Sequence, residues 1–558
     1  MSLLFKLMRR YSGRILFWIF SKPFVGRFIA GLPLLREFFS KFLINRMAKT
    51  ARTRPHPWST QSRYPSWASL TDKTWSGRHL PVNERKSVQP SWDGEDGLRP
   101  VFARPVGGQR MCPKSTLLFA TFAQYLTDGF IRTKPEKDPD TGRSNKENRK
   151  QNTSNHEIDM CPLYGRTAEQ TKALRVSEPE PPERGMLRSQ FIKDEEYPCF
   201  LFSDGELNPD YTVLDTPLGL REILENCKSE DAKIAAGAVM LRDNLFAVGG
   251  DRVNSVPQVS LMNTLWLREH NRLCRELGKQ NESWTDDQVF ETARNIVIVE
   301  FIKIVIEDYI NHILPLAVPL VANPSVAWKA PWNKPNWITT EFSLLYRWHA
   351  LIPDSIRWGD VDYTIGNGYL MNNGILLQTG LQKAFEDLSA QQAGELGPRN
   401  TNEHLLDIEA KSIEQGRICS LQSYNDYREY LGMDRVTKFS QISKDPGVTE
   451  KLSKAYAGNV DDVEFFVGIF SESRIPNSPL PKTIATFVAL DAFTQALPNP
   501  LLSQHVFGSV EEKESTFTKY GVSQINACGT LADIVSRNIK DAGSLGFIGM
   551  TQQGWTPE

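Results

Sequence analysis

The stretch LMNTLWLREHNRLCREL, residues 261–277, decides the fold class of this chain. Its apolar residues recur at helical spacing with charged residues between them, which predicts a helix packed into a core. A second helix is predicted directly after it, because Thr285-Asp286-Asp287-Gln288 has the spacing of a capping box. The following run, residues 289–313, is apolar around much of its circumference and belongs in the centre of a large domain.

Further helices are predicted outward from this pair, at residues 117–131, 343–352, 376–390, 408–430 and 530–539. Strand-like alternation is scarce, and the sequence contains no internal repeat, Gly-rich phosphate loop or metal-ligand cluster of usual spacing. The fold class is therefore predicted to be mainly α. At 558 residues with 40% hydrophobic content, the chain is long enough for one large core and a smaller appended unit.

The chain is divided by composition into residues 1–50, 51–110 and 111–558. The first segment is basic and amphipathic, the second is an irregular strap rich in Pro, Trp, Ser and Arg, and the third is the helical domain. Within the third segment, residues 134–154 are almost wholly polar and charged, which predicts an exposed loop.

Charge is balanced overall but not locally. The formal net charge of -1 gives no reason to expect nucleic acid as a partner. Residues 1–54, however, contain twelve Lys or Arg residues and one acid, Glu37, among Phe, Leu, Ile and Trp. This asymmetry favours binding of the segment to a surface of anionic lipid.

The N-terminal apolar run, residues 15–20, is too short to span a bilayer, and Lys22 and Arg27 interrupt the next apolar stretch. We expect several short amphipathic helices, broken near residues 21–23 and 31–33, that lie in the headgroup boundary as a monotopic, peripheral anchor. Two alternatives stay open: a signal peptide, whose cleavage site at Ala30-Gly31 would be poor, and helices packed on the protein's own core. The cellular compartment is not indicated.

The seven cysteines are scattered without a C-x-x-C pair, so neither a zinc site nor a dense disulfide framework is expected. Among the eight histidines, His349 is the best candidate ligand because it follows Tyr346 by three residues on a predicted helix, Tyr346-Arg347-Trp348-His349. That spacing would put the phenol and imidazole on one helix face. Taken alone, the tetrapeptide is more typical of an aromatic packing cluster than of a ligand site.

Five blocks in order extend the comparison from residue 117 to residue 546. They are Phe122-Ala123-Gln124 with Asp128, Thr264 to Arg272 (TLWLREHNR), Ile304 to Tyr309 (IVIEDY), Glu341-Phe342 leading to Tyr346-Arg347-Trp348-His349, and Asn372 to Leu377 (NNGILL). With these blocks the chain resembles the animal-type haem peroxidase superfamily, and within it the cyclooxygenase branch.

The resemblance implies a helical domain with haem between a distal helix that carries Gln124 and a proximal helix that carries His349, the axial iron ligand. Trp348 and Arg252 would also lie at the cofactor. Tyr346 matches the tyrosine that becomes a radical and takes a hydrogen atom from a polyunsaturated fatty acid, after which O2 adds. The branch forms dimers, so a homodimer is an expectation.

The distal side departs from the family pattern at Asp128, where the family has a histidine. A carboxylate with an ordinary pKa near 4 is a weaker proton carrier at neutral pH unless burial raises that pKa, so slow turnover of peroxide is expected. Arg252 matches a distal arginine of mammalian peroxidases outside the branch, although a surface ion pair explains it equally well. Thr127 and Ser255 stand where mammalian peroxidases esterify their haem, which implies non-covalent haem b.

The residues expected to contact the substrate depart further from the family pattern. Arg46 matches the arginine that meets the fatty-acid carboxylate, with a lipid-headgroup contact as the alternative. Leu316 replaces its tyrosine partner, Thr494 replaces a channel serine, and Phe466 replaces a tyrosine near the haem.

The sequence thus predicts a haem-dependent dioxygenase that forms a fatty-acid hydroperoxide or endoperoxide. Two rivals remain: a haem peroxidase that oxidises small molecules, with Tyr346 a bystander, and a non-catalytic haem- or lipid-binding relative.

Overall fold

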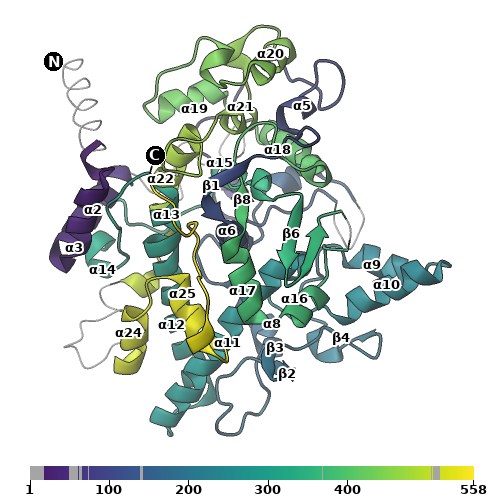
Figure 1. The fold of residues 1–558 in the computed structure, drawn as a ribbon, viewed down its shortest axis with the longest axis vertical. Helices are drawn as coiled ribbons and strands as arrows, with labels where there is room; N and C mark the ends of the chain where they lie inside the picture. The colour runs from purple at the N-terminus through teal and green to yellow at the C-terminus, as the bar shows by residue number, and fades with distance from the viewer. Residues whose placement is uncertain are drawn as a thin grey trace.

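The computed structural model describes residues 18–48, 61, 66–72, 74–137, 143–366, 368–503, 506 and 516–557. Across these residues the chain is mainly helical, and its strands are short (Figure 1). The predicted fold class is confirmed. One large apolar core joins most helices, and a smaller apolar cluster lies beneath α9 (Leu220–Asn226) and α10 (Ala232–Asp243), which project from the body (Figure 1).

Two long helices form the centre, α11 (Pro257–Gln280) and α12 (Asp286–Ile304). They pack against each other, and α6 (Leu117–Phe130) and α25 (Leu531–Asn538) pack on α11. The predicted capping box is present: the Thr285 hydroxyl accepts from the Gln288 N–H at 3.2 Å, and the Gln288 side chain accepts from the Thr285 N–H at 2.9 Å. Sequence periodicity therefore located the centre of the fold correctly.

Beyond α12 the helix widens. A π-helical segment, η4 (Val305–Ile310), carries Tyr309 and leads into α13 (Asn311–Ile313). The predicted run to residue 313 is thus helical throughout, but one turn is wider than an α-helical turn. π-Helical turns occur frequently at functional sites.

Two other predicted helices are each divided in two. Residues 376–390 fall into α16 (Gly374–Thr379) and α17 (Leu381–Ala390), because Gly380 takes a positive φ of 77°. Residues 408–430 fall into α18 (Leu406–Ile418) and α19 (Tyr424–Tyr430). The continuous helices predicted there were wrong.

The remaining helices surround this centre. The α-helices are α2 (Pro23–Ala30), α3 (Pro33–Met47), α4 (Trp67–Thr71), α5 (Arg99–Phe102), α7 (Cys161–Tyr164), α8 (Ala168–Leu174), α14 (Pro324–Ala327), α15 (Thr340–Leu345), α20 (Pro446–Ala455), α21 (Phe465–Ser471), α22 (Lys482–Ala496) and α24 (Thr518–Asn526). The 3₁₀ turns are η1 (Lys146–Lys150), η2 (Pro209–Tyr211), η3 (Val253–Ser255), η5 (His349–Leu351), η6 (Glu403–Leu405), η7 (Phe439–Gln441), η8 (Val460–Asp462), η9 (Pro500–Leu502) and η10 (Ala542–Ser544).

The strands form two-stranded antiparallel sheets. The pairs are β1 (Met111–Thr116) with β8 (Gln392–Gly394), β2 (Ser189–Ile192) with β3 (Glu195–Pro198), β4 (Phe202–Ser203) with β5 (Glu206–Leu207), and β6 (Ser355–Trp358) with β7 (Val361–Thr364).

The stretch predicted as an exposed loop, residues 134–154, is only partly so. Residues 138–142 lie outside the described part of the chain, but η1 packs near α18, and Asn152 is buried. The Asn152 amide donates to the Phe130 carbonyl at 3.0 Å and accepts from the Arg132 N–H at 2.8 Å. These bonds fix the end of the segment against α6, which composition alone could not predict.

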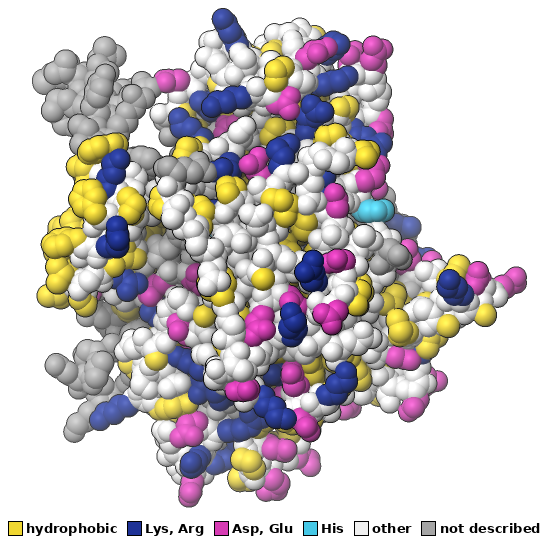
Figure 2. Space-filling model, in the orientation of Figure 1, with side chains coloured by type: hydrophobic (Ala, Val, Ile, Leu, Met, Phe, Trp, Pro, Cys, Tyr) yellow, Lys and Arg dark blue, Asp and Glu magenta, His cyan; other side chains and the backbone are white. Residues whose placement is uncertain are grey.

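The N-terminal helices α2 and α3 are separated as predicted, at residues 21–23 and 31–33; residues 1–17 lie outside the description. Much of their apolar surface faces outward: Trp18, Phe24, Phe28, Leu32, Leu34, Phe38 and Phe42 are exposed. Figure 2 shows this patch along one edge of the molecule, with Lys and Arg among the apolar side chains. None of the described helices is long and apolar enough to span a membrane.

A buried charge network joins α11, α12 and α25. The guanidinium of Arg537 lies 3.0 Å from Glu300 and 3.4 Å from Glu269, and both carboxylates are fully buried. Burial raises the pKa of Glu300, and neighbouring Glu269 raises it further, whereas Arg537 opposes the shift. Glu269 also pairs with Arg272 at 2.6 Å, so Arg537 is chiefly the counter-charge of Glu300.

Replacing Arg537 by Ala should lower the free energy of unfolding by about 3–5 kcal/mol, because it leaves the buried carboxyl of Glu300 without its direct partner. Thermal and denaturant unfolding would measure this. The matched control is Arg221→Ala, which removes an exposed i,i+4 pair with Glu225 and should change stability by less than about 0.5 kcal/mol. Equal effects of the two substitutions would contradict the assignment.

Candidate functional site

Helix α6 presents a polar stripe. Its N-cap hydroxyl, on Thr116, accepts from the Phe119 N–H, and most of the helix is buried. Gln124, Thr127 and Asp128 are the half-buried exceptions, and their spacing puts them on one face. The Gln124 amide makes no hydrogen bond to any residue in the described part of the chain, so it is available to a ligand.

Asp128 forms an ion pair with Arg252. Arg252 Nη1 lies 3.5 Å from Asp128 Oδ1 and 3.2 Å from the Ile131 carbonyl. Burial raises the pKa of Asp128 to about 6; Arg252 opposes this shift, and Asp251 adds to it. Its other oxygen, Oδ2, is buried and makes no hydrogen bond to a described residue. The pair is thus partly buried, and the carboxyl titrates close to neutral pH.

The segment Tyr346 to His349 is not the helix that was predicted. Helix α15 ends at Leu345, Tyr346 caps it with φ -94° and ψ 15°, and His349 begins the 3₁₀ turn η5. The backbone therefore breaks between the two residues, and the argument that helical spacing puts both on one face was wrong. They are brought near each other by a turn instead.

An aromatic stack seats this turn on α6. The ring of Trp348 lies 4.8 Å from that of Tyr346 and 5.9 Å from that of Phe119, and both pairs are stacked. The Trp348 indole N–H donates to the Leu345 carbonyl at 2.6 Å. Trp348 thus has a packing role that places α6 and the Tyr346–His349 turn in contact.

The phenol of Tyr346 is half-buried and packs against Phe342, with ring centroids 4.9 Å apart. Burial raises its pKa, the Tyr309 hydroxyl lowers it, and the Asp491 carboxylate raises it again. Tyr309 lies on the π-helical segment, and its buried hydroxyl makes no well-aligned hydrogen bond to a described residue. The phenol of Tyr346 therefore stays protonated at neutral pH.

Two charged residues at this site were missed by the sequence reasoning. Glu409, on α18, has Oε1 3.2 Å from His349 Nδ1. Its position could have been found, because residues 409, 412, 413 and 416 share one face of a predicted helix and that face is largely small or apolar. Its contact with His349 could not, because the two residues lie sixty positions apart in the chain.

Arg347 is the second. Its Nε is buried without a hydrogen-bond partner, and its guanidinium forms no ion pair with a described residue. Burial lowers its pKa to about 10, the positive charges of Arg252 and Arg149 lower it further, and the carboxylates of Asp128 and Glu409 oppose the shift. A buried cation left without a close counter-ion is costly. Arg347 is thus suited to an anionic partner.

The predicted substrate residues lie in three separate parts of the chain. Arg46 is exposed on α3, Leu316 lines a pocket of about 270 Å³ with Lys114 and Trp555, and Thr494 is buried in α22. The Thr494 hydroxyl donates to the Asp491 carbonyl at 2.9 Å. Their roles stay predictions.

Three further positions differ from the family pattern: Thr127, Ser255 and Phe466. The Thr127 hydroxyl donates to the Ala123 carbonyl at 3.0 Å, and the Ser255 hydroxyl is buried without a partner in the described residues. Phe466 is buried and stacks on Phe102 at 5.9 Å. Neither Thr127 nor Ser255 can supply a carboxylate.

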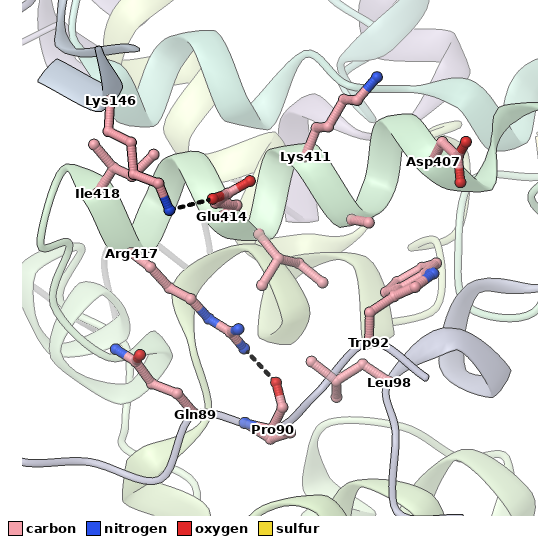
Figure 3. A pocket seen from close by; sticks show the side chains of 12 residues that line it. Gln89, Pro90, Trp92, Leu98, Lys146, Asp407, Lys411, Glu414, Arg417 and Ile418 are labelled. Carbon is pink, nitrogen blue, oxygen red and sulfur yellow. Dashed lines mark hydrogen bonds and ion pairs between the residues drawn. The ribbon is translucent and has the colours of Figure 1, made fainter. Parts of the chain in front are cut away.

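A separate surface pocket of about 620 Å³ lies on the outer face of α18 (Figure 3). Two pairs bridge its rim: Lys146 with Glu414 at 3.2 Å, and the Arg417 guanidinium with the Pro90 carbonyl at 2.7 Å. It is distinct from the site around His349, which lies at the inner face of the helix, where Glu409 is buried. No group of three or more potential metal ligands occurs in the described part of the chain.

Comparison with known proteins gives relatives along nearly the whole chain. Prostaglandin G/H synthase 1 of Rattus norvegicus is 28% identical over 531 residues, which cover 91% of this chain and 79% of that protein. Prostaglandin G/H synthase 2 of Equus caballus is also 28% identical, over 92% of this chain and 79% of its own.

Solved structures share the fold. A fatty acid alpha-dioxygenase of Oryza sativa, a point variant solved with palmitic acid, has a TM-score of 0.65 at 15% identity and covers 99% of this chain and 97% of its own. Peroxidase A of Dictyostelium discoideum has a TM-score of 0.64 at 17% identity and covers 89% of this chain and all of its own. At these identities the likeness establishes the fold alone.

The family comparison is decisive for classification, because residues 118–546 match the animal haem peroxidase family and include α6, the Asp128–Arg252 pair and the Tyr346–His349 turn. The chain therefore belongs to the animal haem peroxidase family and is an oxidoreductase of that haem-binding superfamily.

Proposed function

We propose that this protein oxygenates polyunsaturated fatty acids with O2, using haem as cofactor and Tyr346 as the residue that abstracts hydrogen. The observation that carries the proposal is the half-buried phenol of Tyr346, which the Trp348 stack holds at the same turn as His349. The names of the relatives, prostaglandin G/H synthases and fatty acid alpha-dioxygenases, support this substrate class.

The residues of the site suit a haem. Asp128 Oδ2, Ser255 Oγ and Arg347 Nε are all buried polar atoms without a hydrogen bond to the described residues. Buried polar atoms normally have partners, so their concentration here favours a missing group that is itself charged. His349 would bind the iron, and Arg347 would meet a carboxylate of the porphyrin edge. Attachment would be non-covalent, because Thr127 and Ser255 cannot form carboxylate esters.

When bound, the haem supplies a strong one-electron oxidant after reaction with a peroxide. On the distal side, ionised Asp128 takes the proton from the arriving peroxide and returns it to the leaving oxygen, while the Gln124 amide hydrogen-bonds to the peroxide. Arg252 stabilises the ionised carboxylate through their 3.5 Å contact. Burial brings the pKa of Asp128 to about 6, which offsets much of the disadvantage expected of a carboxylate.

The oxidation of Tyr346 then leads to hydrogen abstraction from the lipid. Loss of one electron and the phenolic proton leaves a neutral phenoxyl radical, which takes a hydrogen atom from a bis-allylic carbon and becomes a phenol again. O2 adds to the carbon radical, and the resulting peroxyl takes the phenol hydrogen back to give a hydroperoxide. If the peroxyl first closes a ring, the carbon radical that results adds a second O2, and this second peroxyl takes the phenol hydrogen instead. Either route leaves Tyr346 as a radical for the next cycle.

The exposed apolar faces of α2 and α3 give such a substrate an entrance from the bilayer. Phe24, Phe28 and Leu34 are each more than 60% exposed, and Lys22, Arg27 and Lys41 accompany them on the same two-helix unit. Aromatic side chains with basic neighbours are typical of helices that lie in the headgroup boundary. We infer a peripheral, monotopic attachment, with Arg46 near the carboxylate of the entering fatty acid.

Replacing Tyr346 by Phe should abolish O2 uptake with linoleate or arachidonate, by at least about 100-fold, because the abstracting phenol is gone. An oxygen electrode measures this loss. Haem binding and peroxide consumption should persist, and the control Tyr363→Phe on β7 should behave as wild type. Persistent O2 uptake would leave Tyr346 a bystander and favour a small-molecule peroxidase, the function that the name of Peroxidase A suggests. If haem-loaded wild-type protein showed no O2 uptake and no peroxide consumption, a non-catalytic relative would be favoured.

The rate of reaction with peroxide should rise about tenfold per pH unit below pH 6 and level off above it. The sign follows from Asp128, whose ionised form accepts the proton and whose pKa burial raises to about 6. Stopped-flow absorbance at the Soret band would measure the rate. Arg252→Gln should move the midpoint to higher pH, because it removes the charge that favours the carboxylate. A profile unchanged by Asp128→Asn would rule Asp128 out.

The variant with Phe24, Phe28, Leu34 and Phe38 changed to Ser should lose at least about 100-fold in partition to phosphatidylcholine–phosphatidylserine vesicles, since each buried side chain is worth about 1.5–3 kcal/mol. Vesicle sedimentation measures the partition. The control changes Ile234 and Met240, exposed apolar residues of α10, to Ser. Equal loss in both variants would show that the α2–α3 patch has no special role.

A further inference from the structure

The second ring nitrogen of His349 faces a buried carboxylate. Nδ1 lies 3.2 Å from Oε1 of Glu409, whose residue is 2% exposed. The atoms are within ion-pair distance, but the direction of the ring N–H is not aligned for a hydrogen bond, and Nδ1 has no other partner among the described residues. The 3.2 Å distance is short enough for a hydrogen bond once the imidazole rotates into line.

Glu409 is held in place from the other side. The Thr401 hydroxyl donates to the same Oε1 at 2.9 Å, and Oε2 is buried without a hydrogen bond to the described residues. A carboxylate that is fully buried costs several kcal/mol unless a cation or donors compensate it. In the described part of the chain, the direct partners of this carboxylate are one hydroxyl and the His349 imidazole, and the Arg347 guanidinium interacts with it electrostatically without a direct contact.

Its position on α18 separates Glu409 from the ordinary surface charges of that helix. Asp407, Lys411 and Glu414 face the outer pocket of Figure 3, where Glu414 pairs with Lys146. Glu409 lies on the opposite, buried face with Ser412. The helix therefore carries one carboxylate inward, to the imidazole.

We propose that Glu409 is a positioning residue that accepts the Nδ1–H of His349 and thereby leaves Nε2 as the metal-binding atom. This inference rests on the proposed haem ligation by His349. The hydrogen on Nδ1 fixes the tautomer and the ring orientation, and the negative carboxylate makes Nε2 a stronger donor. A stronger donor favours the higher oxidation state of the bound iron, so the ferric form gains relative to the ferrous form.

The test compares Glu409→Gln with Glu414→Gln, a matched control on the exposed face of the same helix. In Glu409→Gln the iron–histidine stretching band of the ferrous protein, read by resonance Raman, should move to lower frequency. The ferric–ferrous midpoint potential should rise by about 59 mV for each tenfold loss of ferric preference. Haem affinity, read from Soret titration, should fall about 10- to 100-fold. Glu414→Gln should change none of these.

Thr401→Val gives a second variant with the opposite sign. Removing the competing hydroxyl leaves Oε1 to the imidazole alone, so the stretching band should move to higher frequency and the potential should fall. An unchanged band and potential in Glu409→Gln, with haem bound, would overturn this inference and leave the haem proposal standing. Both proposals would be overturned if the wild-type protein formed no Soret band. They would also be overturned if the His349→Ala variant kept the iron–histidine band.

Discussion

Trp348 lies between Tyr346 and Phe119, and this three-ring stack sets where the two sides of the site meet. Aromatic pairs of this kind are worth about 0.5–1.5 kcal/mol each beyond area burial. Phe119 belongs to α6, which carries Gln124 and Asp128, while Trp348 belongs to the turn that carries Tyr346 and His349. The distance between Gln124 and Asp128 on one side and His349 on the other therefore depends on the packing of these aromatic rings.

Burial determines how the charged groups of the site behave. Asp128 has an ordinary carboxyl group, yet removal from water brings its pKa to about 6, and the opposing charge of Arg252 keeps it from rising further. The same removal from water lowers the pKa of Arg347 to about 10, where two other guanidinium groups add to the effect. The departure of the sequence from a distal histidine is thus less severe than residue type alone suggests.

Local pattern predicted local structure well and contacts poorly. The capping box at Thr285 and the amphipathic spacing of residues 261–277 were sufficient for α11 and α12, because hydrogen bonds and faces within a helix repeat with sequence. The helix predicted through residues 343–352 failed, because tertiary contacts of Tyr346 and Trp348 outweigh helix propensity there. The roles of Glu409 and Arg347 depend on residues that are distant in sequence, so a local pattern does not reveal them.

The π-helical segment that carries Tyr309 has a geometric consequence. An α-helix advances each residue by about 100° around its axis, so the wider turn over Val305–Ile310 rotates everything after it relative to an uninterrupted α12. The orientation of Tyr309 toward Tyr346 therefore depends on the wider π-helical turn in which it lies. A relative that lacked one residue there would keep every side chain of the site and yet point this phenol elsewhere.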